Sequence, residues 1–389
     1  MLRYFWTAAA FVLSWKINND AGVSPSDCLT ASTFSALAAC YADFTVPADF
    51  YDATTYAAAQ PTAEEATAFR AAVMRMLDVS SGSGNCFGST LPPALEGIYG
   101  VHSFTDSESG GVYCVLAETH AKGTYARGWG FMAVPDTSLS PLAQMSSQTH
   151  QSLMPSSPQP SSPSLGIHLS APHPIFDGDT DLQAATLFAK TRSRSLFIAG
   201  RDRRAYKAPT DCVSRKSSAV YYATDPAHSV TEPFHLAQVA IKDWQDAHGG
   251  CPHATCAYIQ LHGKASTSCS QDTAFISSGL GRDDDALNWY SDYSRNLPAR
   301  RLQATLADAF PSWNVSLPTD SGCTLLATKT VFGRYVNGVP AWALCDTDAT
   351  VNGATGEFIH VEQAIESRRE DAYEMWGTAL RETFAGPGV

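Results

Sequence analysis

The order of apolar runs and amphipathic segments after residue 165 most constrains the fold of this chain. Short apolar runs of strand length alternate with segments of helical periodicity. The expected order is strand 165–169, helix 182–190, strand 195–199, helix 232–247, strand 256–261, a helical segment 286–310 interrupted near Pro298, strand 324–329, strand 358–361 and helix 364–384. Such alternation is typical of a sheet covered by helices on both faces. We therefore expect an α/β fold with a mixed, mostly parallel sheet flanked by helices.

The chain divides into three predicted parts. Residues 1–24 have the features of a secretory signal peptide, because Arg3 precedes an apolar run of suitable length. Residues 25–105 are predicted to form a helical N-terminal region, and 106–389 an α/β domain. Within that domain, 136–164 is rich in Ser and Pro and is predicted to be a disordered insertion. The expected elements before the insertion are helices 31–41 and 63–77 and strands 111–118 and 129–134.

Cysteine usage also indicates an extracellular protein. The chain has ten cysteines, an even number spread over most of its length, which allows up to five disulfides in an oxidising compartment. Cys28 and Cys40 could staple the first helical region. Cys251 and Cys256 lack the second cysteine pair that a zinc ribbon requires. We therefore expect a secreted protein in which no cysteine is a nucleophile.

Charge and hydropathy exclude two classes of partner. The formal net charge is -12, whereas a nucleic-acid-binding protein needs a basic face. No apolar run reaches the roughly 18 to 20 residues needed to span a bilayer. The expected partner is a small-molecule or peptide substrate, with no nucleic acid and no membrane.

A histidine and two acids lie between the predicted strand 165–169 and the following helix. His173 is flanked by Pro172 and Pro174, which restrict the backbone and hence the position of the imidazole. Asp177 is the preferred carboxylate ligand of a metal, with Asp179 as the alternate. The competing interpretation is structural, since Asp-Gly-Asp is an ordinary turn and Asp179 could cap the helix.

A second histidine completes a predicted metal site. His262 ends the apolar run 256–261 and precedes a glycine. Together with His173 and Asp177 it would supply three protein ligands to a catalytic zinc, leaving a position for water. Such a metal lowers the pKa of the water and polarises a carbonyl. The alternative is that His262 is a hydrogen-bonded core residue.

Glu362 is the expected catalytic base. It lies at the end of the apolar run 358–361, where an unpaired carboxylate is costly unless it is functional. It would take a proton from the activated water and return it to the leaving amine. A salt bridge to Arg368 is the structural alternative. His360 lies two residues earlier and shares its face in a regular strand.

Three further residues are candidates for substrate binding. Arg201 and Arg203 follow the predicted strand 195–199, and either could clamp a substrate carboxylate. His228 could contact the substrate or stabilise an oxyanion. A solvated basic loop is the alternative for the arginines. Motifs for a serine nucleophile, a phosphate-binding loop or a dinucleotide fold do not occur in the sequence.

At these residues the chain resembles the N-formylglutamate amidohydrolase group and, more distantly, the zinc carboxypeptidases. The resemblance lies in the order of Ala171-Pro-His173 with Asp177, Gln260-Leu-His262, and the segment 361–368 with Glu362. The run 195–203 is similar to the strand that carries a substrate-binding arginine. The carboxypeptidases place the first histidine and the acid three residues apart, whereas Asp177 is four residues after His173.

The resemblance implies a zinc-peptidase-like core and an enzyme of the amidohydrolase or carboxypeptidase type. The expected function is zinc-dependent cleavage of an amide bond in a peptide or acylated amino acid. Two alternatives remain open. One is a non-catalytic secreted binding protein on an amidohydrolase-like scaffold, and the other is a metal-dependent esterase or deacetylase.

Overall fold

A computed structural model describes most of the chain, namely residues 24–86, 90–119, 121–122, 124–137, 165–213 and 220–386. The expected signal peptide lies outside the described residues apart from Ser24. Of the expected insertion at 136–164, only Asp136 and Thr137 are described.

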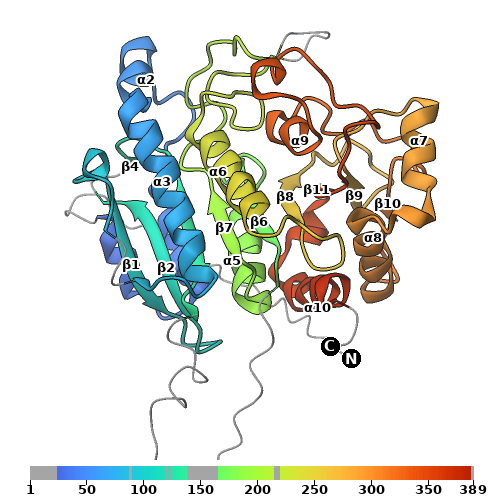
Figure 1. The fold of residues 1–389 in the computed structure, drawn as a ribbon, viewed down its shortest axis with the longest axis horizontal. Helices are drawn as coiled ribbons and strands as arrows, with labels where there is room; N and C mark the ends of the chain where they lie inside the picture. The colour runs from blue at the N-terminus through green and yellow to red at the C-terminus, as the bar shows by residue number, and fades with distance from the viewer. Residues whose placement is uncertain are drawn as a thin grey trace, which may run out of the picture.

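A nine-stranded sheet forms the centre of the molecule (Figure 1). Its spatial order is β1 (Tyr99–Thr105), β2 (Val112–Glu118), β5 (Phe131–Pro135), β7 (Ser195–Ile198), β6 (His168–Ala171), β8 (Tyr258–Gly263), β11 (Phe358–Gln363), β9 (Ala274–Ser277) and β10 (Val315–Ser316). A separate small sheet pairs β3 (Ala121–Lys122) with β4 (Thr124–Tyr125). The strands before and after the insertion, β5 and β6, are not neighbours, because β7 lies between them.

The sheet is mixed, as expected, but it is not mostly parallel. Four strand pairings are parallel and four are antiparallel. The parallel pairings join β7, β6, β8 and β11 in the middle of the sheet, with one more at the β9–β10 edge. The carboxyl ends of the four central strands therefore meet at one edge, where open α/β sheets place their chemistry.

Helices cover both faces of the sheet. On one face lie α3 (Ala63–Ser80), α6 (Pro233–Ala247) and α9 (Val331–Val336), which share a buried apolar cluster with β2, β5 and β7. On the other lie α1 (Phe34–Ala42), α5 (Thr180–Thr191), α8 (Pro298–Ala309) and α10 (Tyr373–Phe384). Two further helices, α2 (Ala53–Ala59) and α7 (Asp284–Ser291), lie outside these layers. The expected α/β architecture with flanking helices is confirmed.

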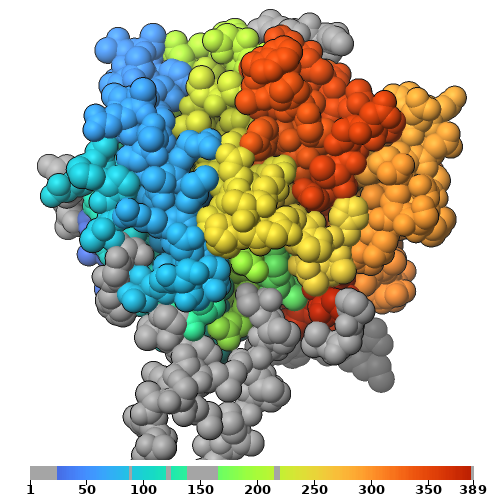
Figure 2. All heavy atoms as spheres, viewed as in Figure 1, coloured from blue at the N-terminus to red at the C-terminus, as the bar shows by residue number. Residues whose placement is uncertain are grey.

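The segment 25–105 contributes directly to the sheet and its covering helices. Its last residues, Tyr99–Thr105, form the edge strand β1, so the expectation of a helical region is wrong there. Helix α3 begins at a capping box in which Thr62 and Glu65 exchange hydrogen bonds. In the space-filling view α3 and the neighbouring N-terminal residues (blue) abut α6 (yellow) across the face of the molecule (Figure 2). Both large cores contain residues from either side of residue 105.

Two expected elements near the C-terminus are wrong. Residues 324–329 form no strand. The expected helix 364–384 is interrupted, because short 3-10 turns at Ile365–Arg368 and Glu370–Ala372 precede α10. The turns bury Ser367, whose hydroxyl donates to Gln363 Oε1 at 3.0 Å, and place Arg368 where its guanidinium donates to the carbonyl oxygen of Gly178. Strand β9 was not predicted, because its apolar run is only four residues long and ends before Ser278 and Gly279.

All ten cysteines form disulfides, as the even count allowed. The pairs are Cys28–Cys40, Cys86–Cys114, Cys212–Cys345, Cys251–Cys256 and Cys269–Cys323. Five disulfides fit an oxidising compartment such as the cell exterior. Within the described ranges, none of the helices has both the length and the apolar character that a membrane crossing requires.

Asp181 in the first turn of α5 gives the fold a predicted dependence on pH. The side chain is buried, which raises the carboxyl pKa from 3.8 to about 6, although backbone N–H groups at the helix start lower it. The native carboxyl thus keeps a proton that the unfolded chain loses near pH 3.8. The free energy of unfolding therefore falls by about 3 kcal/mol as pH rises through this window.

The Asp181→Asn variant should lack this loss of stability. We expect urea denaturation to show a higher free energy of unfolding than wild type at about pH 7, by up to ~3 kcal/mol, and a much smaller difference at about pH 4. Lower stability of the variant at neutral pH would mean that the carboxylate is stabilised in the native state.

Candidate metal centre

Four chemically active side chains meet at the carboxyl edge of the central strands. His173 lies in the loop that follows β6, and His262 lies near the end of β8. On the neighbouring strand β11, Glu362 pairs in register with His262, and His360 is two residues earlier. Because alternate residues share a face of a strand, His360 and Glu362 lie together, and their Nε2 and Oε1 atoms are 3.5 Å apart. The expected convergence of these strand ends is therefore observed.

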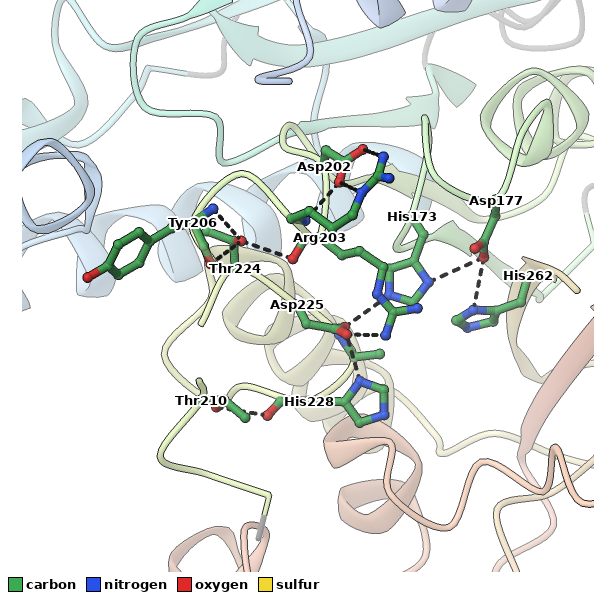
Figure 3. A network of polar contacts seen from close by, with 12 residues as sticks. His173, Asp177, Asp202, Arg203, Tyr206, Thr210, Thr224, Asp225, His228 and His262 are labelled. Carbon is green, nitrogen blue, oxygen red and sulfur yellow. Dashed lines mark hydrogen bonds and ion pairs between the residues drawn. The ribbon is translucent and has the colours of Figure 1, made fainter. Parts of the chain in front are cut away.

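One oxygen of Asp177 links the two expected histidine ligands. Asp177 Oδ2 lies 3.2 Å from His173 Nδ1 and 3.3 Å from His262 Nδ1. Figure 3 shows the carboxylate between the two imidazoles. The ring centroids are 4.9 Å apart, and one donor atom from each residue lies within 4.8 Å of the others. All three residues are buried. The described part of the chain thus contains a buried group that could hold a metal ion.

Local backbone features hold the Asp177 loop against β8. The Asp177 amide donates to the carbonyl oxygen of His173 at 3.0 Å, which closes the turn. A Cβ atom at Gly263 would lie 2.3 Å from the Asp177 carbonyl oxygen, so only glycine permits this approach. Arg368 Nη1 donates to the carbonyl oxygen of Gly178 at 2.5 Å. Arg368 therefore supports the loop, and it forms no ion pair with Glu362 within the described residues.

A second possible donor group shares His262 with the first. This group consists of His262, His360 and Glu362, and each offers one donor atom that lies within 4.8 Å of the other two. The rings of His262 and His360 have centroids 4.4 Å apart. His262 Nε2 and His360 Nδ1 are buried without a hydrogen-bond partner. Buried polar atoms normally have partners, so these two nitrogens point to a ligand in this part of the site.

Asp225 lies behind His173, on the side away from Asp177. Its Oδ1 atom is 3.0 Å from His173 Nε2, and its other oxygen pairs with the Arg203 guanidinium (Figure 3). A carboxylate in this position fixes the tautomer of a metal-binding histidine, because Nε2 donates to it and the Nδ1 lone pair faces the ligand. The sequence offered only a weak signal for Asp225, an acid in a Thr-Asp-Pro segment fifty-two residues after His173.

The electrostatics of the site differ between its histidines. Burial lowers the pKa of His262 to about 4 and that of His360 well below its ordinary value, so both imidazoles are neutral at pH 7. Burial and Arg203 also act to lower the pKa of His173, but Asp177 and Asp225 outweigh them and raise it. Burial, reinforced by Asp177, raises the pKa of Glu362 to about 8. Neutral imidazole is the form that binds metals.

A pocket of about 380 Å³ opens over these groups. Its lining includes His173, Asp177, His262, His360 and Glu362. The other lining residues are Phe176, Arg203, Tyr221, Ala227, His228, Gly263, Lys264, Ala265, Ser268 and residues 324–330. The segment expected as a strand at 324–329 therefore forms a wall of the pocket instead. Disulfide Cys269–Cys323 joins this wall to the loop after β8.

The expected substrate-binding residues have different positions. Arg201 is buried away from the pocket lining, where it donates to the carbonyl oxygen of Gly128 at 3.0 Å and pairs with Glu232 at 3.4 Å. Arg203 lines the pocket, but its guanidinium pairs with Asp225. His228 also lines it and stacks on Tyr221 with ring centroids 3.6 Å apart.

Asp179, the alternate ligand, is not in the site. It is exposed at the N-cap of α5 and adopts a left-handed conformation with φ of 58°. Its side chain makes no capping hydrogen bond, so the structural role considered for it is also absent. Two cysteine-containing groups also have donor atoms within 4.8 Å of one another, namely Cys86 and Cys114 with Asp136, and Cys269 and Cys323 with Asp272. In both groups the sulfurs are joined in a disulfide.

Comparison with known proteins adds little to this geometry. No family model matches the chain, and no curated protein matches its sequence. Among solved structures, the crystal structure of the gene product Atu2144 from Agrobacterium tumefaciens aligns over 57% of this chain and 88% of its own. The sequence identity is 14% and the TM-score is 0.35. A likeness at this level carries no argument about function, so the site must be judged by its own residues.

Proposed function

We propose that this protein is a secreted, zinc-dependent hydrolase that cleaves an amide bond in a peptide or an acylated amino acid. One observation carries the proposal: two imidazoles and a carboxylate converge at the carboxyl edge of the sheet, with a second carboxylate beside them in a pocket. Three protein donors and an accessible pocket are the arrangement of a catalytic zinc site. The five disulfides support the assignment to the cell exterior.

Three residues that line this pocket fit a zinc ion. His173, Asp177 and His262 would hold it, since imidazole nitrogen and carboxylate oxygen are donors that zinc accepts. The unpartnered His262 Nε2 and His360 Nδ1 atoms add to the reasons for a cation in this region. A zinc ion in such a site lowers the pKa of a bound water toward about 7 and polarises a carbonyl oxygen.

The protein side chains have separate tasks in this proposal. Asp225 acts as a positioning residue, because it orients the His173 imidazole, and Arg203 in turn holds Asp225. Glu362 is the general base, which accepts a proton from the attacking water. The water oxygen bonds to the acyl carbon, the carbon–nitrogen bond breaks, and the amine leaves with the proton from Glu362. A cation beside Asp177 would offset the charge that helps to raise the pKa of Glu362, and so would favour the ionised base.

Metal content and turnover test this function directly. Purified protein is expected to carry about one equivalent of zinc. N-acetyl amino acids should be hydrolysed with release of the free amine. Removal of the metal with a chelator should abolish the activity, and added zinc should restore it.

Other outcomes would favour the alternatives. Zinc without turnover of any amide or ester would favour a non-catalytic binding protein on this scaffold. Cleavage of esters or acetylated amines alone would favour an esterase or deacetylase. The proposal would be contradicted if the purified protein contained no zinc and bound none when zinc was added.

A further inference from the structure

One cation in the pocket has no acidic partner. Three lysine or arginine side chains line the pocket, and two of them are engaged. Arg203 pairs with Asp225, and Lys329 Nζ lies 2.7 Å and 2.8 Å from the two oxygens of Asp348. For the described parts of the chain, no carboxylate lies within 4.0 Å of the Lys264 ammonium. Lys264 is nevertheless only 7% exposed.

The position of Lys264 follows from the strand that carries it. His262 and Lys264 are two residues apart, so both project from the same face of β8 and its extension. The Lys264 amide donates to the carbonyl oxygen of Gln363 at 2.9 Å, which continues the ladder between β8 and β11 by one residue. The side chain therefore starts from a fixed backbone and points into the pocket beside Glu362.

A second part of the pocket lining, residues 324–330, is also held in place. Residues 324–330 begin one position after Cys323, whose disulfide to Cys269 holds them near the loop after Lys264. The wall presents the partly buried apolar residues Leu325 and Leu326. An ammonium group and an apolar surface thus lie in one pocket, a combination that fits a ligand with a charged and an apolar end.

The Lys264 stem is packed against protein, whereas its ammonium is not among the buried unpartnered atoms and is accessible in the pocket without a counter-ion from the described residues. A ligand carboxylate that enters the pocket can therefore form an ion pair with Lys264 that no described protein side chain supplies. Among the described residues, the acids with the largest effect on Lys264 act at longer range: Asp272 accepts hydrogen bonds from Ser316 and Ser321, Glu366 is exposed, and Glu362 lies beside the metal donors.

We propose that Lys264 binds a free carboxylate of the substrate, so that the enzyme selects N-acyl amino acids, or peptides cleaved next to a free C-terminus, with an apolar side chain. This inference rests on the proposed hydrolase function and adds its substrate class. Lys264 takes the role that the sequence suggested for Arg201 or Arg203, because neither arginine is free to bind a substrate in the described structure.

A different role for Lys264 is possible on the same geometry. Its charge could act only on Glu362, by favouring the ionised form of that carboxylate. In that case a neutral substitution would impair all substrates alike through kcat and would move the pH profile. Carboxylate recognition predicts instead a change in KM that is confined to substrates with a free carboxylate. The two roles are therefore separable by kinetics.

The test compares N-acetyl-L-phenylalanine with its carboxamide as substrates of the full-length protein. For Lys264→Met, we expect the ratio of kcat/KM for the acid to kcat/KM for the amide to fall by about 10- to 100-fold, as for the loss of a hydrogen bond to a charged group. Lys264→Arg keeps the charge and should recover most of the ratio. Lys207→Met is the matched control, since Lys207 is a half-exposed lysine that pairs with Asp49 outside the pocket.

A binding measurement separates this inference from the hydrolase proposal. Calorimetric titration of the zinc-loaded protein with the same acid and amide requires no turnover. Weaker binding of the acid to Lys264→Met, with unchanged binding of the amide, would support carboxylate recognition even if wild type hydrolyses neither compound. An equal effect on both compounds, or no effect on the acid, would overturn the inference even in an active enzyme.

Discussion

The His262→Ala protein is expected to contain only traces of zinc and to lose at least ~10³-fold in kcat/KM. His262 belongs to both donor groups of the centre, so its removal affects any arrangement in which a metal binds there. A catalytic metal contributes several kcal/mol to the stabilisation of a transition state, and each 1.36 kcal/mol corresponds to about a tenfold change in rate. Elemental analysis after dialysis, together with amine release, measures both effects.

Asp179→Asn is the matched control for this prediction, because Asp179 is close in sequence but exposed and outside the site. It should keep its zinc. Two further variants decide between the donor groups. Loss of zinc in Asp177→Asn with retention in His360→Ala would support the group formed with His173. The opposite pattern would indicate that His262, His360 and Glu362 bind the metal, and it would contradict the role of Glu362 as the general base.

The Glu362→Gln protein should bind zinc like wild type but turn over about 10²- to 10⁴-fold more slowly. Glutamine is nearly isosteric with glutamate, but it cannot accept the proton from the attacking water. The loss should appear in kcat, with KM much less affected, because the base acts in the transition state. Stopped assays on N-acetyl amino acids and parallel metal analysis provide the measurement.

Glu366→Gln serves as the control for the base. Glu366 is exposed on the turn after β11 and does not line the pocket. Its substitution should leave kcat within about twofold of wild type, as for a surface change away from the site. Full activity of Glu362→Gln would exclude the base assignment, whereas loss of zinc from this variant would identify Glu362 as a ligand.

The sequence predicted the parts of the site that depend on local pattern. His173, His262 and Glu362 each follow or end an apolar run, and a strand end has a defined place in an α/β sheet. His262 and Glu362 lie side by side because β8 and β11 are parallel neighbours in register, a pairing that the two apolar runs do not specify by themselves. Asp177 could be predicted as a ligand because it follows His173 by only four residues in the same loop.

The remaining features depend on contacts that no local pattern reveals. Arg201 and Arg203 are two residues apart and look equivalent in sequence. In the fold Arg201 meets Glu232 in the core, while Arg203 meets Asp225 behind a histidine. Strand β1 was not predicted, because the formation of an edge strand depends largely on its partner, here β2. The pairing partners of such residues are set by tertiary structure.

The carboxylate oxygen shared by two imidazoles has a consequence for assembly of the centre. Protons on the ring nitrogens can bridge His173, Asp177 and His262 in the metal-free protein. The loop is therefore cross-linked without an ion, and its ordering entropy is lost during folding. If these residues hold a divalent cation as proposed, its uptake would exchange protons for the ion on a preformed template and would release hydrogen ions to the solvent.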